Sequence, residues 1–266
     1  MQNIVIIDCG SQFTQLIARR VRELKIHSVV LPWDAPAERV RGLTPLGVII
    51  SGGPDSVNAQ DAIAVDREVL ALGVPVLGVC YGMQLMTKYL GGTVSSGGSA
   101  EYGVTPVEVK GSPRLFKGLT GGSSARLNVL MSHGDHVAAV PEGFMVTAAT
   151  DNGVIAAMED REGRRFGLQF HPEVAHTEHG MDILRNFLFD VCGCQGDWKL
   201  EDWVDSTVRE IRDRVGSGRV VCGLSGGVDS SVAAALVNRA IGPQLECVFV
   251  DHGLMRLHEA EQVMAS

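Results

Sequence analysis

The stretch GVCYGMQ, residues 78–84, decides the fold of the first part of this chain. The apolar run 74–79 ends at Cys80, and an apolar pattern with helical spacing begins directly after it. A strand followed at once by a helix places Cys80 on a sharp turn, a nucleophile elbow, with its thiol pointing out of the sheet. Gly78 and Gly82 suit this turn because a side chain at either position would collide with the next strand or helix.

A second motif, HPEVAHT at residues 171–177, follows an apolar stretch far downstream. A cysteine between Val79 and Tyr81 is by itself most often a small core residue. His171 and Glu173 change this interpretation, because they supply a base and a carboxylate that can orient the base. We therefore predict a catalytic triad of Cys80, His171 and Glu173.

Strand-like and helix-like segments alternate from the N-terminus, with strands expected at 4–7, 28–31 and 48–50. This alternation predicts an α/β fold with an open, mostly parallel sheet and helices on both faces. Beyond Gly97 the pattern changes to short β-rich runs, typical of added or antiparallel strands, at 104–109, 129–132, 145–149, 154–158 and 165–170. A helix expected at 181–191 closes the first domain, which we place at residues 1–194, with a linker at 195–200.

Residues 201–266 predict the first part of a second α/β domain that binds nucleotides. An amphipathic helix is expected at 201–215, followed by a strand at 220–224, the turn SGGVDSS at 225–231 and another helix. A glycine-rich loop between strand and helix can hold phosphate, because free backbone N–H groups and the helix dipole converge on it. The loop is not a Walker loop, since no lysine follows its second glycine.

Composition limits the possible classes of protein. With 266 residues and 45% hydrophobic residues, the chain can bury a full core and has room for one large domain and part of another. A net charge of −8 gives no general attraction to nucleic acid or anionic membranes. The six cysteines lack the spacing of a secreted disulfide framework, and no apolar run is long enough to span a bilayer. We expect a cytoplasmic protein.

The histidines at 171, 176 and 179 and the cysteines at 192 and 194 raise the question of a zinc site. Zinc needs ligands that converge on one point. His171 is already paired with Cys80, and the two cysteines flank a single glycine in a linker. We therefore predict no protein-held metal site.

The elbow at Cys80, the pair His171 and Glu173, and the turn GGP at 52–54 resemble the class I, triad-type glutamine amidotransferases. The loop at 225–231 resembles the pyrophosphate-binding loop of the ATP pyrophosphatases. The amidotransferase motifs followed by the pyrophosphatase loop, together with FVD at 249–251, make the chain similar to the family of glutamine-hydrolysing GMP synthetases over essentially its whole length.

The chemistry expected of the first domain is glutamine hydrolysis. Cys80 would attack the side-chain amide, and backbone N–H groups of Gly53 and Tyr81 would stabilise the oxyanion. The resemblance implies that Gln84 and the turn formed by Ser132, Gly134 and Asp135 hold the amino and carboxylate ends of glutamine. His133 is expected to shape this turn. No cofactor is expected for this half-reaction.

The complete enzyme implied by the resemblance is a carbon–nitrogen ligase of purine biosynthesis. It would use ATP and Mg²⁺ to adenylylate xanthosine monophosphate, and ammonia from glutamine would displace AMP to give GMP. It would act as a homodimer, without a nucleic-acid or membrane partner. The residues implied for ATP and pyrophosphate are Ser225, Gly226, Gly227, Val228, Asp229, Ser230 and Ser231, with Asp251 as a further candidate.

The family continues through the rest of the pyrophosphatase domain and a dimerisation domain that accepts xanthosine monophosphate. We therefore expect a truncated chain that supports only the glutaminase half, with the acceptor site beyond residue 266. Two alternatives stay open. The first is an amidotransferase that serves another acceptor, in which the loop at 225–231 would have no function. The second is a non-catalytic regulatory remnant, which would not need an intact triad.

Overall fold

A computed structural model of the chain describes residues 2–119, 124–250 and 261. The chain divides into two compact units, Met1–Trp198 (unit 1) and Lys199–Ser266 (unit 2). The division falls inside the segment 195–200 that the sequence indicates as a linker. In the described part of the chain, no helix is long and apolar enough to cross a membrane.

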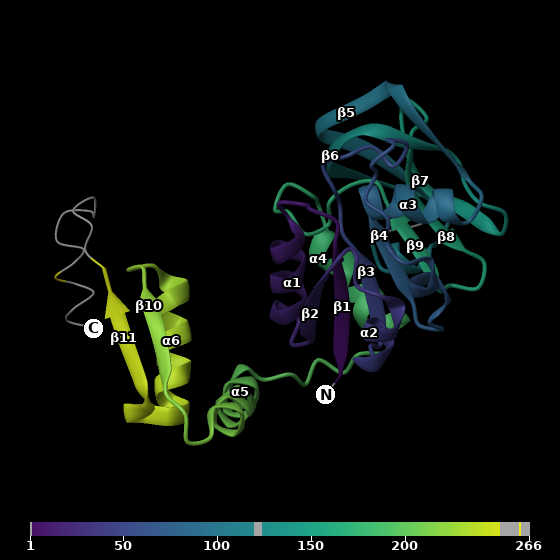
Figure 1. Cartoon of the computed structure of the whole chain (residues 1–266). Helices are drawn as coiled ribbons and strands as arrows, with labels where there is room; N and C mark the ends of the chain where they lie inside the picture. Colours follow the sequence, from purple (N-terminus) through teal and green to yellow (C-terminus); the bar gives the residue numbers. More distant parts are fainter. Residues whose placement is uncertain (1, 120–123, 251–260, 262–266) are drawn as a thin grey trace. The chain divides into compact units, whose positions relative to one another are not determined.

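Unit 1 alternates strands and helices over its first half and is strand-rich afterwards (Figure 1). The elements of the first half are β1 (Asn3–Asp8), α1 (Thr14–Glu23), β2 (His27–Pro32), α2 (Ala37–Gly42), β3 (Gly47–Ile50), the 3-10 helix η1 (Arg67–Ala71), β4 (Val76–Val79) and α3 (Tyr81–Tyr89). The elements that follow are β5 (Thr93–Lys110), the 3-10 helix η2 (Arg114–Phe116), β6 (Ser124–Ala139), β7 (Phe144–Thr150), β8 (Ile155–Asp160), β9 (Arg165–Leu168), α4 (Gly180–Arg185) and the π-helix η3 (Asn186–Val191).

The described strands of unit 1 form one nine-stranded sheet of order β2-β1-β3-β4-β9-β8-β7-β5-β6. Strands β2, β1, β3, β4 and β9 are parallel. Strands β8, β7, β5 and β6 extend this sheet through antiparallel pairs. The α/β fold predicted from the sequence is confirmed. The change of pattern beyond Gly97 marks the antiparallel extension for the runs in β5–β8, but the run 165–170 was grouped wrongly with them, because β9 pairs in parallel with β4.

Helices cover both faces of the parallel part of this sheet. Side chains of a strand point alternately to opposite sides, so each face presents apolar residues that pack against helices. Ile4 and Ile6 of β1 belong to one buried cluster with residues of α1, α4 and η3. Val5 and Ile7 belong to a second cluster with residues of α2, η1 and α3. All four side chains are fully buried. The near-continuous apolar run of β1 is thus explained by burial on both faces of a parallel strand.

The predicted lengths of two strands were wrong. The sequence predicted short strands at 104–109 and 129–132, but these belong to β5 and β6, which pair as a long antiparallel ribbon. A register shift between Ser96 and Glu101 interrupts the ribbon. Glycine and serine at 95–99 hide the alternating pattern that would have revealed its full length.

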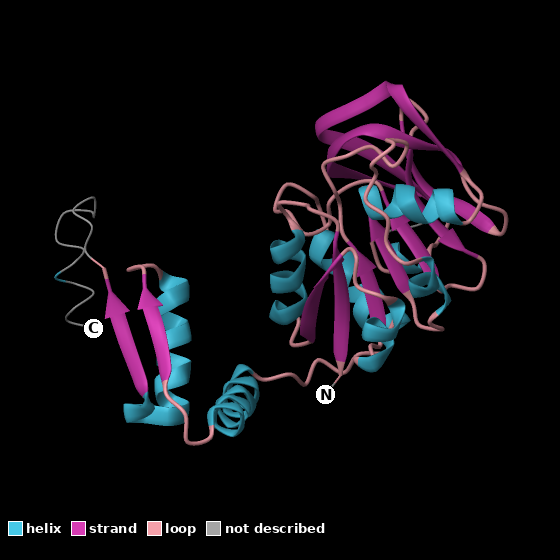
Figure 2. Ribbon diagram, in the orientation of Figure 1, coloured by secondary structure: helices cyan, strands magenta, loops and turns pink. Residues whose placement is uncertain are grey.

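Unit 2 contains α5 (Leu200–Val215), β10 (Val220–Leu224), α6 (Val228–Ile241), the 3-10 helix η4 (Gly242–Gln244) and β11 (Leu245–Phe249) (Figure 2). β10 and β11 are parallel and joined through α6. Val208 of α5 packs with Ala240 and Ile241 of α6 in a small buried cluster. Val221 and Val248 on the strands remain 68% and 43% exposed, so this pair of strands has little apolar cover.

The elbow at Cys80, between β4 and α3, has a strained backbone. Cys80 has φ 51° and ψ −107°, a conformation that side chains with a Cβ rarely adopt. Its N–H donates to the carbonyl of Leu168 at 2.7 Å. A Cβ on Gly78 would lie 2.5 Å from the carbonyl carbon of Gly82, and a Cβ on Gly82 would overlap the carbonyl of Ile50. The two glycines therefore allow α3 to approach β3 and β4 closely.

We predict that Gly82→Ala lowers the free energy of unfolding by about 2 kcal/mol, because the new methyl group must push α3 away from β3. Urea denaturation measures this loss. Gly42→Ala is the matched control, since no atom lies within 4 Å of the added methyl, and it should change stability by less than about 1 kcal/mol. Equal effects of the two substitutions would contradict the close approach.

Candidate active site

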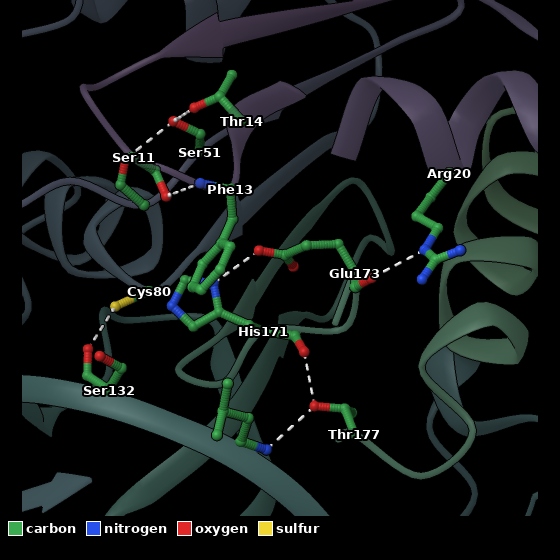
Figure 3. Close-up of polar contacts among 12 residues, drawn as sticks. Ser11, Phe13, Thr14, Arg20, Ser51, Cys80, Ser132, His171, Glu173 and Thr177 are labelled. Carbon is green, nitrogen blue, oxygen red and sulfur yellow. Dashed lines mark hydrogen bonds and ion pairs between the residues drawn. The ribbon is translucent and has the colours of Figure 1, made fainter. Parts of the chain in front are cut away.

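His171 and Glu173 lie on the segment that follows β9 and form a buried pair. Nδ1 of His171 is 2.7 Å from Oε1 of Glu173, and the two residues are 4% and 1% exposed. The carboxylate therefore accepts from the Nδ1–H group and turns the other ring nitrogen toward Cys80. Figure 3 shows the imidazole between the thiol of Cys80 and the carboxylate of Glu173.

Neighbouring residues hold this pair in place (Figure 3). Arg20 of α1 donates its Nε–H to the carbonyl oxygen of Glu173 at 2.9 Å, and the hydroxyl of Thr177 donates to the carbonyl of His171 at 2.6 Å. The ring of Phe13 meets the imidazole edge-on, with centroids 5.2 Å apart. Both the backbone and the ring of His171 are thereby fixed.

The surroundings of His171 favour its protonated form. Burial opposes the positive charge, but hydrogen bonds to Cys80 and Glu173 and their charges outweigh it and raise the pKa of His171 to about 10. Cys80 precedes the first turn of α3, whose positive end favours a negative sulfur. The arrangement suits a thiolate–imidazolium pair.

A cavity of about 340 Å³ opens beside Cys80 and gathers the glutamine-site residues expected from the sequence. It is lined by Gly53, Pro54, Asp55, Ser56, Cys80, Tyr81, Gln84, Tyr102, Ser132, His133, Gly134 and Asp135. Three parts of the chain meet here, namely the loop after β3, the start of α3 and the ribbon β5–β6. All six residues that the sequence indicated for the oxyanion and for glutamine face this one cavity.

The backbone N–H groups of Gly53 and Tyr81 are available to a ligand. Among the hydrogen bonds of residues 2–119 and 124–250, none uses either of these donors. Position 53 has to be glycine, because a Cβ there would lie 2.7 Å from the carbonyl oxygen of Cys9. Ser51 anchors this loop, since its hydroxyl accepts from the N–H of Cys9 at 2.9 Å and donates to the carbonyl of Gly52 at 2.9 Å.

The polar side chains of the cavity are oriented by bonds to one another. Nε2 of Gln84 donates to the carbonyl of Asp135 at 2.8 Å and to Oε1 of Gln169 at 3.1 Å. Its two N–H groups are thus used, and its carbonyl oxygen is left to accept from a ligand. The hydroxyl of Ser56 donates to the carboxylate of Asp135. An acceptor and a carboxylate so placed suit an ammonium group.

His133 is part of the cavity lining but only 4% exposed, with Nε2 3.5 Å from Oε2 of Glu101 on the paired strand. Burial lowers the pKa of His133 and is only partly opposed by Glu101. The turn predicted at Ser132, Gly134 and Asp135 was wrong, because these residues lie inside β6. Serine, glycine and aspartate are typical of turns, but pairing of Ser132, His133 and Asp135 with β5 keeps this stretch extended. His133 faces Glu101 across the two strands.

Four residues of the site were not predicted from the sequence, namely Gln169, Phe13, Thr177 and Arg20. Gln169 is the clearest omission, because it is fully buried and its Nε2 lies 3.5 Å from Sγ of Cys80. A polar residue inside the apolar run 166–170 was the available signal. Thr177 belongs to the motif at 171–177, but nothing in the motif indicated its contact with His171. Phe13 and Arg20 carried no signal, since only the tertiary fold brings them to His171 and Glu173.

In unit 2, the loop expected to hold phosphate joins β10 to the start of α6. The hydroxyl of Ser230 accepts from the N–H of Ser225 at 3.2 Å and donates to the carbonyl of Gly227 at 3.1 Å. Gly226 adopts φ +79°. These contacts curl the loop over the N-terminus of α6. Asp251 lies outside the described residues.

We predict that raising the pH from about 6 to about 10 removes a stabilising contribution of His171. The pKa of His171 is raised in the folded state above its ordinary 6.5, so the contribution is fully present below that value and is lost as the pH rises through about 10. The measurement is the difference in unfolding free energy between the wild type and His171→Gln. This difference should shrink with pH, and a constant difference would contradict the protonated pair.

Comparisons with known proteins give matches to both parts of the chain. Residues 5–191 match the family model of class-I glutamine amidotransferases, and residues 198–256 match that of NAD synthase. A solved structure from Thermoplasma acidophilum, described as that of a GMP synthase subunit, superimposes with a TM-score of 0.62 at 28% identity. The match covers 73% of this chain and 94% of the Thermoplasma chain.

Two curated relatives extend over the whole chain. The glutamine-hydrolysing GMP synthase of Enterococcus faecalis is 50% identical over 266 residues, which are 100% of this chain and 50% of that protein. The enzyme of the same name from Carboxydothermus hydrogenoformans is 51% identical over 261 residues, which are 98% of this chain and 50% of that protein. The chain spans about half the length of these curated relatives. The family match and the elbow fold together show that the chain belongs to the class-I glutamine amidotransferases.

Proposed function

We propose that unit 1 hydrolyses glutamine to glutamate and ammonia, with Cys80 as nucleophile, His171 as acid and base, and Glu173 as the group that orients His171. One observation carries the proposal. A strained cysteine on the wall of a polar cavity adjoins an imidazole whose Nδ1 is 2.7 Å from a buried carboxylate. This is the geometry of an activated nucleophile.

The reaction begins when the sulfur of Cys80 attacks the side-chain carbonyl carbon of glutamine. The C=O electron pair moves to the oxygen, which is stabilised by the N–H groups of Gly53 and Tyr81, worth about 3 kcal/mol per donor in such sites. The imidazolium of His171 gives its proton to the amide nitrogen, and the C–N bond breaks to release ammonia. A glutamyl thioester remains on Cys80.

Water completes the cycle. His171, now neutral, takes a proton from water as its oxygen attacks the thioester carbonyl. The C–S bond breaks, glutamate leaves, and the thiolate–imidazolium pair is restored. Glu173 keeps the imidazole in one tautomer throughout and favours its cationic form.

The cavity supplies groups for both ends of free glutamine. The free carbonyl oxygen of Gln84 and the carboxylate of Asp135 suit the α-ammonium group. Ser132 and Gly134, on the same strand β6 as Asp135, are assigned to the α-carboxylate. A substrate held at its α-carbon in this way reaches Cys80 with its side-chain amide.

We further propose that the chain forms the amidotransferase half of a glutamine-hydrolysing GMP synthase, a cytoplasmic ligase of purine biosynthesis. Ammonia from unit 1 would aminate xanthosine monophosphate that ATP and Mg²⁺ have activated, in a homodimeric enzyme. Support comes from the 50% identity to the Enterococcus faecalis enzyme across the whole chain and from the match of residues 198–256 to NAD synthase.

The loop of unit 2 fits the phosphates of ATP. The early N–H groups of α6 have no partner within a helix, and the helix dipole adds positive potential at the same end. Ser225, Gly226, Gly227, Asp229, Ser230 and Ser231, with Val228, are assigned to the pyrophosphate part of ATP. Magnesium would be bound by the phosphates themselves.

We predict that Cys80→Ala lowers the rate of glutamate release from glutamine by at least about 10³-fold, because no other group can form the thioester. A coupled glutamate assay measures the rate, without nucleotides and then with ATP, Mg²⁺ and xanthosine monophosphate. Cys247→Ala, which changes an exposed cysteine of unit 2, is the control and should keep the wild-type rate. Release that survives in folded Cys80→Ala would disprove the proposal.

For unit 2 we predict that Ser230→Ala weakens the binding of Mg²⁺–ATP about two- to tenfold, because the loop loses the hydroxyl that links Ser225 to Gly227. Calorimetric titration measures the dissociation constant. Ser217→Ala, at an exposed position outside the loop, should leave it unchanged. Unchanged affinity in Ser230→Ala would count against this use of the loop.

A further inference from the structure

Gln169 occupies a position that the backbone fixes on both sides. Its N–H donates to the carbonyl of Ala156 on β8 at 2.9 Å, and the carbonyl of the preceding Leu168 accepts from the N–H of Cys80 at 2.7 Å. The residue is fully buried. The strand that leads to His171 is thus tied to the elbow at the point where Gln169 projects its side chain.

The side-chain amide of Gln169 connects the nucleophile to the glutamine cavity. Its Nε2 donates to Sγ of Cys80 at 3.5 Å. Its Oε1 accepts from Nε2 of Gln84 at 3.1 Å, and Gln84 in turn lines the cavity. One buried side chain therefore contacts both the sulfur of Cys80 and a residue that lines the cavity.

Besides His171 and Gln169, the sulfur of Cys80 contacts a carbonyl oxygen, and this contact makes the donor on Gln169 important. As a neutral thiol, Cys80 donates its S–H to the carbonyl oxygen of Ser132 at 3.6 Å. Once the proton has left, the same carbonyl oxygen faces a negative sulfur and disfavours it. A thiolate at this position needs N–H donors, and a hydrogen bond to a charged partner is stronger than one between neutral groups.

We propose that Gln169 is a further catalytic residue, whose amide N–H stabilises the thiolate of Cys80 while its carbonyl oxygen holds Gln84 in position for glutamine. The inference rests on the proposed role of Cys80 as nucleophile. It adds a contact to the reacting atom beyond the triad and the two oxyanion donors. It also explains why a polar side chain sits in the buried run 166–170.

The test is the rate at which iodoacetamide alkylates Cys80, measured without glutamine and located by peptide mass spectrometry. Gln169→Met keeps the length of the side chain but removes its N–H donor. We expect alkylation at neutral pH to fall roughly tenfold, and at strongly alkaline pH to equal that of the wild type, because hydroxide then ionises the thiol in either protein. Gln169→Glu, which puts a carboxylate beside the sulfur, should fall further.

Asn186→Leu is the matched control. Asn186 is another side-chain amide with two hydrogen bonds, to the carbonyls of Leu115 and Lys117, and it does not touch the cavity. Its loss should leave alkylation at neutral pH unchanged. Near-ultraviolet circular dichroism checks that each variant is folded.

Two results would overturn the proposal. The first is wild-type alkylation of folded Gln169→Met at neutral pH. The second is a decrease of equal size at every pH, which would indicate restricted access and a purely structural role. A failure of the proposed glutaminase function would give a different result. Alkylation of Cys80 would still depend on Gln169, but the wild type would release no glutamate from glutamine.

Discussion

The backbone of Cys80 is the constraint on which the site depends. A residue with a Cβ held at φ 51° and ψ −107° costs roughly 1–3 kcal/mol, so the surrounding structure has to enforce it. The enforcing contacts are the bond from its N–H to Leu168, the bond from the N–H of Gly82 to the carbonyl of Ser51 at 3.1 Å, and the close approach that Gly78 and Gly82 allow. Together they turn the thiol out of the sheet.

The same contacts bring the remaining groups to the sulfur. β3, β4 and β9 are neighbouring parallel strands, so their carboxyl ends meet at one edge, where ligands of open α/β sheets bind. The chain leaving β3 supplies Gly53, the chain leaving β4 supplies Cys80, and the chain leaving β9 supplies Gln169 and His171. The antiparallel ribbon β5–β6 then closes the cavity with residues 132–135 of β6.

Much of this was predictable from the sequence because the decisive signals are local. The apolar runs, the glycines beside Cys80 and the spacing of His171 and Glu173 each indicate a structure within a few residues. Gln169 was missed because a buried amide resembles an isolated polar residue until its partners are known. The length of β5 and β6 was missed because glycine and serine at 95–99 interrupt the alternation of β5, and only pairing with the other strand continues the ribbon there.

The most direct test of covalent catalysis by Cys80 is to detect the acylated enzyme. The chain is mixed with glutamine, quenched in acid within the first turnover, digested and examined by mass spectrometry. We expect a glutamyl group on the peptide that contains Cys80, formed in the wild type and absent from Cys80→Ala. Glutamate released by the wild type with no acyl group on Cys80 at any time, or an acyl group on another residue, would contradict the mechanism.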